Sequence, residues 1–274
     1  MARKLFCELH PAFYHASVAK ERGKRHVQNL RRRTLLATER REAPLPNLVK
    51  GHTSLILRKL HNVDMRLQEN KKVNLALAVA RINGLVIHPG ETFSFWYLVG
   101  KPSRRRGYKD GLVIASDAFR ADAGGGLCQL ANMIHYLVLN SPLEVTELHH
   151  HSDALFPDDR RRVPFGTGTS VFYNYVDYRF RNNSDQDVQL LVWIQDDMLY
   201  GELRSEVPFP HRYKLSEENH HFRKEGGSYY RISQVYKIAV NRQTRKEMQR
   251  WLILDNHSRV MYDPSLIPPE EIRP

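Results

Sequence analysis

Three consecutive glycines lead directly into the clearest helical pattern of this chain. Residues 124–126 are all glycine, so their backbone can adopt positive φ and can be approached closely by another segment. Residues 126–140 follow with apolar side chains at the spacing of one helix face, and Asn140 and Pro142 mark the end of that pattern. The sequence therefore predicts a tight turn that places Cys128 in the first turn of a helix.

Helical patterns come first along the chain and most strand patterns come later, which is typical of an α+β protein. We expect N-terminal helices followed by a mixed, mostly antiparallel sheet, with one central helix that starts at the Gly-Gly-Gly-Leu-Cys-Gln motif. The second predicted helix, residues 70–83, has an apolar face formed by Val73, Ala76, Leu77 and Ala80. The other predicted elements are a helix from Thr53, strands over 92–99, 143–151, 171–181, 188–195 and 199–204, and a hairpin over 229–240 and 251–261.

The chain is expected to have three parts. Residues 1–45 read as a basic helical arm or subdomain, residues 46–205 as the core domain, and residues 206–274 as a strand-rich C-terminal extension of that core. An Ala-Pro-Leu-Pro-Asn stretch marks the first boundary, and residues 205–226 are predicted to be a polar linker.

Charge and composition limit the partners and the location that we expect. The chain has 42 Lys and Arg against 30 Asp and Glu, a net +12, and residues 1–50 hold 12 basic and 4 acidic residues, which is +8 of that total. The positive charge of the N-terminal arm predicts that the protein associates peripherally with an anionic membrane face. Nucleic acid is not expected, because aromatic side chains do not interleave with the Arg runs. Neither a long apolar run nor a secretory signal is visible, so a cytoplasmic location, with attachment to the inner membrane face, is predicted.

Cys128 is the residue most suited to chemistry. At a helix N-terminus, free N–H groups and the helix dipole favour a thiolate and can hold an oxyanion. A cysteine nucleophile needs a base, usually His, and residues 149–151 are three consecutive histidines, with His135 as a competitor. Two other interpretations stay open: an inert buried cysteine, and a zinc site of Cys128, His149 and His151 with Asp153. We expect no metal and no cofactor.

An ordered series of short motifs resembles the VanW family. The series spans roughly residues 70–205, and the combination of its Pro-Gly-Glu-Thr-Phe-Ser-Phe and Gly-Gly-Gly-x-Cys-Gln motifs is specific. Its members are Asn83-Gly84, His88 to Phe95, Gly100, Arg106-Gly107-Tyr108, Gly124 to Gln129, His149 to Ser152, and Phe180 to Ser184.

The resemblance implies a link to glycopeptide resistance and cell-wall metabolism. Some exported relatives act as cysteine-dependent L,D-transpeptidases on peptidoglycan stem peptides, so a stem peptide or a cell-wall precursor is the expected partner. The implied site has Cys128 as nucleophile, His151 as base with His149 beside it, backbone donors at Gly125, Gly126 and Gln129, and substrate contacts at Arg106, Tyr108 and Ser152.

Two departures from the family pattern keep a second interpretation open. Gly168 stands where relatives carry an Asp, and residues 130–132 replace the usual Ser or Thr after Cys-Gln. If that Asp orients the histidine, then Asp153, Asp158 or Asp177 must replace it here. The alternative is a non-catalytic accessory protein that keeps the fold and binds cell-wall precursors.

Overall fold

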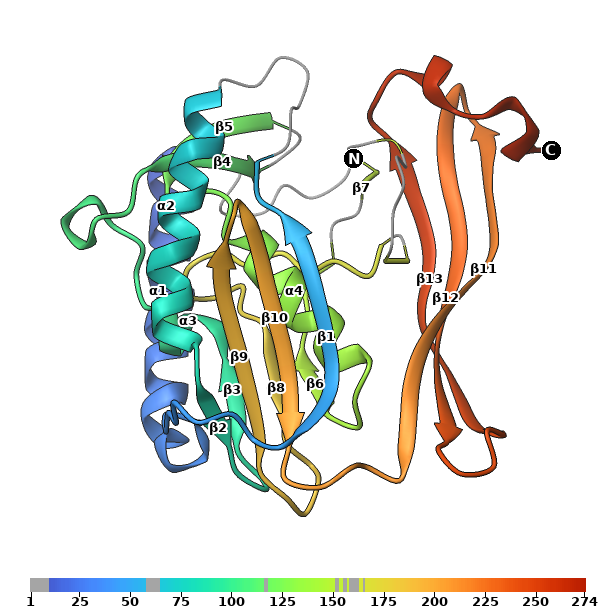
Figure 1. Cartoon of the computed structure of the whole chain (residues 1–274). Coiled ribbons are helices and arrows are strands. Elements are labelled where there is room, and N and C mark those ends of the chain that lie inside the picture. Colours follow the sequence, from blue (N-terminus) through green and yellow to red (C-terminus); the bar gives the residue numbers. More distant parts are fainter. Residues whose placement is uncertain are drawn as a thin grey trace.

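The computed structural model describes residues 10–57, 65–115, 118–150, 153–154, 157, 163–164 and 166–274 (Figure 1). It confirms the predicted α+β class, because a few helices accompany mostly antiparallel sheets. The helices are α1 (Pro11–Arg31), α2 (Met65–Ile82), α3 (Phe95–Val99) and α4 (Cys128–Leu139). The strands are β1 (Asn47–Leu55), β2 (Leu85–Ile87), β3 (Thr92–Ser94), β4 (Asp110–Ala115), β5 (Ala118–Ala123), β6 (Glu144–Glu147), β7 (Asp153–Ala154), β8 (Arg179–Arg181), β9 (Val188–Gln195), β10 (Met198–Ser205), β11 (His211–Glu225), β12 (Ser228–Asn241), β13 (Glu247–Val260) and β14 (Ile272–Arg273).

A four-stranded antiparallel sheet carries the main core. Its strand order is β1-β10-β9-β2, with α4 packed against β1 and β10 and α2 beside β9 (Figure 1). The predicted central helix is confirmed as α4, and its side chains at Leu130, Ile134, Leu137 and Val138 are fully buried. The strands predicted at 188–195 and 199–204 are confirmed as the β9–β10 hairpin, whose turn places Asp196 and Asp197 at positive φ.

Helix α2 confirms a predicted helix but not its predicted buried face. Val73 and its neighbours Ala76 and Ala80 are exposed, so the stripe that we expected to be buried faces outward. The reason is that a buried polar residue, Asn74, faces inward and sets the rotation of the helix. The buried side chains are Gln68, Asn74, Leu75, Ala78, Val79 and Ile82.

Two further local predictions were wrong. Where a helix was expected to start, Thr53–Leu55 are the end of strand β1, because they pair with β10 far along the chain; residues 58–64 of that expected helix lie outside the described residues. The strand expected over residues 92–99 stops at Ser94. The Ser94 hydroxyl there accepts a hydrogen bond from the Tyr97 N–H at 3.3 Å and starts the short helix α3.

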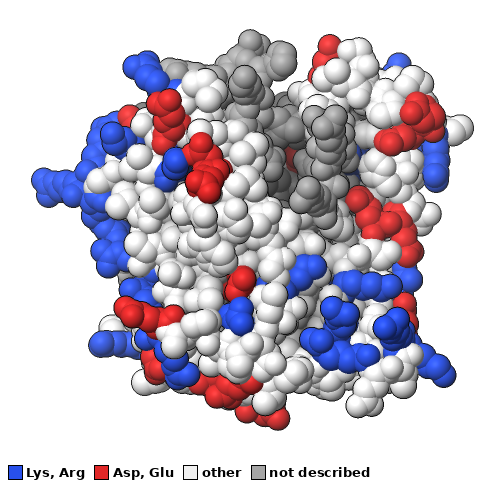
Figure 2. All heavy atoms as spheres, in the orientation of Figure 1, with Lys and Arg blue, Asp and Glu red and all other residues white. Residues whose placement is uncertain are grey.

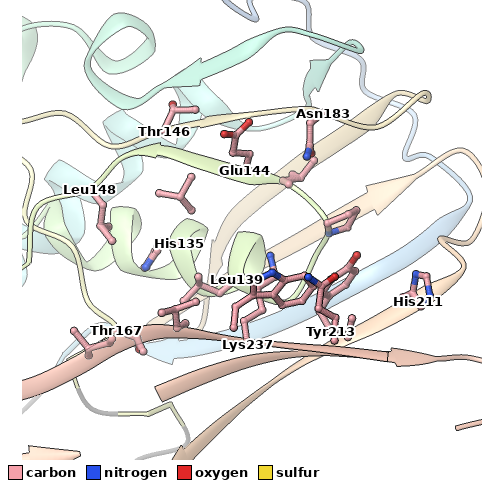
Figure 3. Close-up of a pocket in the computed structure, with 18 of the residues that line it drawn as sticks. His135, Leu139, Glu144, Thr146, Leu148, Thr167, Asn183, His211, Tyr213 and Lys237 are labelled. Atoms are coloured by element: carbon pink, nitrogen blue, oxygen red, sulfur yellow. The ribbon is translucent and has the colours of Figure 1, made fainter. Parts of the chain in front are cut away.

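The C-terminal residues form a separate five-stranded sheet, β14-β11-β12-β13-β7. The predicted hairpin is confirmed as β12 and β13, but residues 211–225, which we expected within a polar linker, form strand β11. The linker prediction was wrong because β11 has a polar sequence and buries few side chains. A cleft lies between this sheet and the core domain (Figure 3).

The positive charge is not gathered on one face. Figure 2 shows Lys and Arg side chains along the left edge and at the lower right, with little charge over the front of the β1-β10-β9 strands. Arg31, Arg32 and Arg33 are exposed where α1 ends, and Arg104–Arg106 form a short 3₁₀ helix. The third Arg triplet, 160–162, lies outside the described residues. Among the described helices, none is long and apolar enough to cross a membrane.

Candidate functional site

Cys128 is the first residue of α4, at the end of the predicted glycine turn. Gly124 and Gly126 have φ of +86° and +92°, which explains why glycine occupies both positions. The Cys128 side chain is partly buried against the main core, with Sγ 3.9 Å from the carbonyl oxygen of Val171. Burial raises the pKa of this thiol, so the expected thiolate is not the resting form.

A residue on α2 holds the glycine turn in place. The Asn74 amide donates to the carbonyl oxygens of Lys109 at 2.9 Å and Gly125 at 3.0 Å, and its own oxygen accepts from the Lys109 N–H at 2.8 Å. Gly111 crosses Gly125 backbone to backbone, because a Cβ on Gly125 would lie 2.1 Å from the Gly111 carbonyl carbon. The only sequence signal for this clamp was that Asn74 is the one polar residue in the otherwise apolar stretch 73–80.

Of the three expected backbone donors, Gly125, Gly126 and Gln129, only Gly126 keeps a free N–H among the described residues. The Gly125 N–H donates to the Asp122 carbonyl at 3.0 Å, and the Gln129 N–H donates to the Gly126 carbonyl at 3.1 Å. Both groups are therefore used inside the turn. Within the described part of the chain, the N–H groups of Gly126 and Leu127 have no hydrogen-bond acceptor, and they are the donors left for an oxyanion.

The predicted histidine stretch is only partly described. His151 and Ser152 lie outside the described residues, whereas His149 is half-exposed and follows β6. The His149 carbonyl accepts from the Ser170 N–H at 2.7 Å, and the next residue, Val171, supplies the carbonyl beside Cys128. Residues 170–171 therefore contact both predicted parts of the site.

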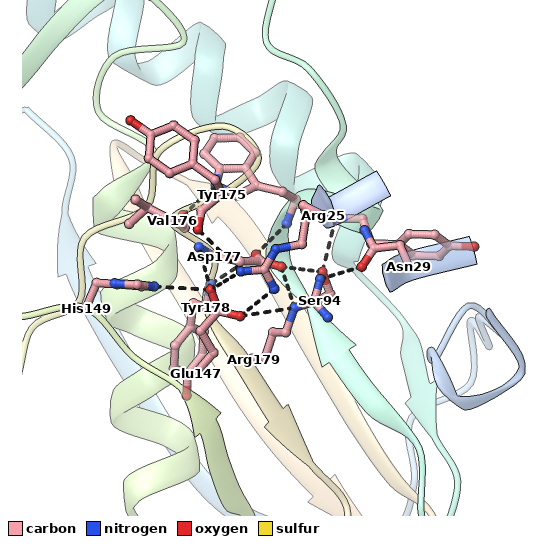
Figure 4. Close-up of polar contacts among 12 residues, drawn as sticks. Arg25, Asn29, Ser94, Glu147, His149, Tyr175, Val176, Asp177, Tyr178 and Arg179 are labelled. Carbon is pink, nitrogen blue, oxygen red and sulfur yellow. Dashed lines mark hydrogen bonds and ion pairs between the residues drawn. The ribbon is translucent and has the colours of Figure 1, made fainter. Parts of the chain in front are cut away.

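His149 is bound to a buried carboxylate, Glu147, with 3.1 Å between Nε2 and Oε1 (Figure 4). Both terminal guanidinium nitrogens of Arg25 donate to Glu147 at 2.6 Å, and the Asp177 N–H donates to it at 3.1 Å. Burial alone would raise the pKa of Glu147, but the hydrogen bonds from Arg25 and His149 outweigh it and hold that pKa below its ordinary value of 4.5.

Glu147, the carboxylate that binds His149, is thus not one of the acids that the sequence suggested. Asp177 is buried and accepts four hydrogen bonds from its own surroundings, while burial raises its pKa and Arg179 opposes that rise. Asp153 lies in β7, on the C-terminal sheet, and Asp158 lies outside the described residues. Glu147 has the geometry of an orienting carboxylate for His149.

Two expected substrate contacts serve the fold in this structure. The Arg106 guanidinium donates to the carbonyl oxygens of Val99 and Lys101, each at 2.8 Å, where α3 ends. Tyr108 is 3% exposed, and burial raises its pKa. Its hydroxyl has no hydrogen-bond partner among the described residues.

The comparisons with known proteins agree with the motif series. The family described as "VanW like protein" matches residues 70–204. The protein named "Vancomycin B-type resistance protein VanW" of Enterococcus faecalis is 31% identical over 204 residues, which is 74% of each chain. The chain belongs to the VanW family. The "Uncharacterized protein YoaR" of Bacillus subtilis is 28% identical over 120 residues, 44% of this chain and 38% of that protein. No solved structure matches the chain.

The VanW-like region contains the glycine turn with its clamp. Asn74, Cys128, Glu147 and His149 all fall within the matched residues. Arg25, which binds Glu147 from α1, lies before them. The partner of the buried carboxylate is therefore supplied from outside the VanW-like region.

The departures from the VanW pattern are neighbours in space. The Asn132 side-chain oxygen of α4 accepts from the Thr169 N–H at 2.6 Å, and a Cβ on Gly168 would lie 3.5 Å from that same oxygen. The Asn132 amide therefore binds the backbone directly beside Gly168. As for the zinc interpretation, the described residues include no cluster of three or more His, Cys, Asp and Glu side chains that could hold a metal ion, and His151 lies outside them.

Proposed function

We propose that this VanW-family protein takes part in cell-wall metabolism linked to glycopeptide resistance, as a cysteine-dependent acyl transferase for peptidoglycan-type peptides. Family membership and the name of the Enterococcus faecalis relative support the link to resistance. The observation that carries the chemistry is the place of Cys128, at the first turn of α4 beside the N–H groups of Gly126 and Leu127 that have no acceptor in the described chain.

In the proposed reaction, a base takes the proton of the Cys128 thiol and the sulfur attacks the carbonyl carbon of a diaminopimelate–D-Ala or Lys–D-Ala bond. The N–H groups of Gly126 and Leu127 bind the oxygen that becomes negative. The base then protonates the leaving D-Ala amine, and water or a second amine releases the acyl group from sulfur. Because burial raises the thiol pKa, the attack needs a base within reach, and His151 is the candidate.

Replacing Cys128 with alanine is expected to abolish release of D-Ala from a tetrapeptide, because no other residue of the turn carries a nucleophile. The matched control is Cys7→Ala, which removes the second cysteine of the chain and should leave the release unchanged. Released D-Ala is measured by chromatography, and circular dichroism checks that both variants fold. Equal D-Ala release by the Cys128→Ala variant and the parent protein would contradict the proposal.

The raised thiol pKa favours the second candidate function, a non-catalytic accessory protein that binds cell-wall precursors. Iodoacetamide reacts with the thiolate, and a raised pKa leaves less of Cys128 in that form. Cys128 should therefore react more slowly than free cysteine at pH 8, and its rate should reach half of its maximum only above pH 9. The rate is measured by mass spectrometry in the Cys7→Ala background. Alkylation faster than free cysteine would rule out the raised pKa and remove the support for this candidate.

A further inference from the structure

A second site is built between the core and the C-terminal sheet, apart from the glycine turn. It is a cleft of about 940 Å³, within the usual range for small-molecule sites. One wall comes from α4 and β6, and the other comes from β11, β12 and β13 (Figure 3). Cys128 does not line this cleft, so the inference below does not rest on the proposed acyl transfer.

Lys237 of β12 brings a positive charge into this cleft. Its ammonium lies 4.9 Å from the centre of the Tyr213 ring, another lining residue, and no carboxylate of the described residues pairs with it. Burial lowers the pKa of Lys237 to about 8, so the group is still mostly charged at pH 7. Lys237 is half-buried, so its ammonium loses part of its hydration without gaining a carboxylate from the described residues, and an anion from outside the chain would supply that partner.

The cleft is also lined by His135, His150, His211, Glu144 and Glu147, and the two carboxylates together with a neutral His135 favour a ligand with a single negative charge. His135 is buried, its Nδ1 is 3.1 Å from the Tyr178 hydroxyl, and burial, with His150 and Lys237 nearby, lowers its pKa to about 3. It is therefore neutral and adds no second cation. Glu147 and Glu144 also line the cleft, which disfavours a dianion such as phosphate.

Most of the remaining lining is apolar or aromatic. These side chains come from both walls, so an apolar body would be covered on two sides while its charged end reaches Lys237. They are Leu139, Leu143, Val145, Leu148, Met248, Trp251, Ile253 and Leu254.

We propose that this cleft binds a monocarboxylate with an apolar or aromatic body, whose carboxylate pairs with Lys237. Such a group is found both on the C-terminal residue of a peptide and on a fatty acid. One ammonium matches one carboxylate, and the two apolar walls match the rest of the molecule.

The test compares N-acetyl-phenylalanine with its amide, and adds octanoate, by isothermal titration calorimetry on the full chain. The acid should bind the parent protein at least tenfold more tightly than the amide, and Lys237→Met should remove that preference, since a charge-assisted pair is worth about 1.5–3 kcal/mol. Lys224→Met is the matched control, because Lys224 also packs over a tyrosine ring, at 5.7 Å from Tyr229, but lies exposed outside the cleft. This control should bind the acid as the parent does.

The fold of the variant is checked separately. Removing a half-buried charge that has no carboxylate partner among the described residues should leave the thermal unfolding midpoint of Lys237→Met unchanged or higher. Tighter binding of octanoate would assign the cleft to fatty acids, and tighter binding of N-acetyl-phenylalanine to peptide termini; each supports the proposal. Equal binding of acid and amide, undiminished binding of the acid by Lys237→Met, or no binding of either carboxylate would overturn it.

Discussion

Replacing Glu147 with alanine is expected to lower the free energy of unfolding by about 3–5 kcal/mol, the usual cost of removing one partner from a buried ion pair. The Arg25 and Glu147 side chains are only 14% and 17% exposed, and Arg179 lies 3.5 Å from the same carboxylate. The variant leaves both guanidinium groups without this partner. Urea unfolding followed by circular dichroism measures the loss.

The helix that carries Arg25 explains why this change should be so large. None of the described side chains of α1 belongs to the main apolar core. Helix α1 is held instead by polar contacts: the Arg25 pair, the Arg22 Nε–H donated to the Tyr173 carbonyl at 2.9 Å, and the Asn29 oxygen that accepts from Arg179 at 2.6 Å (Figure 4). Part of the positive charge of residues 1–50 therefore serves to attach α1 to the core.

The Glu147→Ala variant should also change how the free energy of unfolding falls as the pH becomes acidic. The pKa of Glu147 is lower in the folded chain than in the unfolded chain, so its stabilisation is complete above the unfolded pKa, near 4.5, and is lost as the pH falls through the folded pKa. The parent should therefore lose more stability than Glu147→Ala below pH 4.5. Glu21→Ala, which breaks the exposed pair with Lys24, is the control and should change nothing measurable. An equal loss of stability below pH 4.5 in parent and Glu147→Ala would contradict this account.

Elements whose pattern is local could be predicted from the sequence. Helix α4 has a continuous apolar face and clear end signals, and the β9–β10 and β12–β13 pairs show their turns in the sequence. Strands β1 and β11 could not be predicted in this way. Strand β1 is defined by pairing with β10, about 150 positions later, and β11 has few buried side chains to give it a period.

In the candidate site, too, the features set by neighbouring residues could be predicted and those set by distant segments could not. The turn, its positive-φ glycines and the position of Cys128 follow from neighbouring residues. The Asn74 clamp and the Arg25–Glu147 pair each join segments more than 30 positions apart. The thiol pKa depends on burial by such segments too, which is why the local argument from the helix N-terminus predicted the wrong direction.

Replacing Gly125 with alanine tests the crossing that positions Cys128. A Cβ on Gly125 would lie 2.1 Å from both the carbonyl carbon and the oxygen of Gly111, and these are backbone atoms that cannot turn aside as a flexible side chain would. We expect a loss of about 3 kcal/mol or more in the free energy of unfolding, because the β4–β5 ribbon or the turn must move. Urea unfolding measures the loss, and the iodoacetamide rate of Cys128 should rise as the turn opens.

A glycine of the same chain that has room for a methyl group provides the matched control. Gly23 lies within α1, and no atom comes within 4 Å of a Cβ placed there. Gly23→Ala should therefore raise the free energy of unfolding by about 0.5–1 kcal/mol, since alanine favours a helix over glycine. The two substitutions add the same methyl group with opposite expected signs. If Gly125→Ala were as stable as Gly23→Ala, the backbone contact with Gly111 would not be what fixes the turn, and the N–H groups beside Cys128 would have to be held by Asn74 alone.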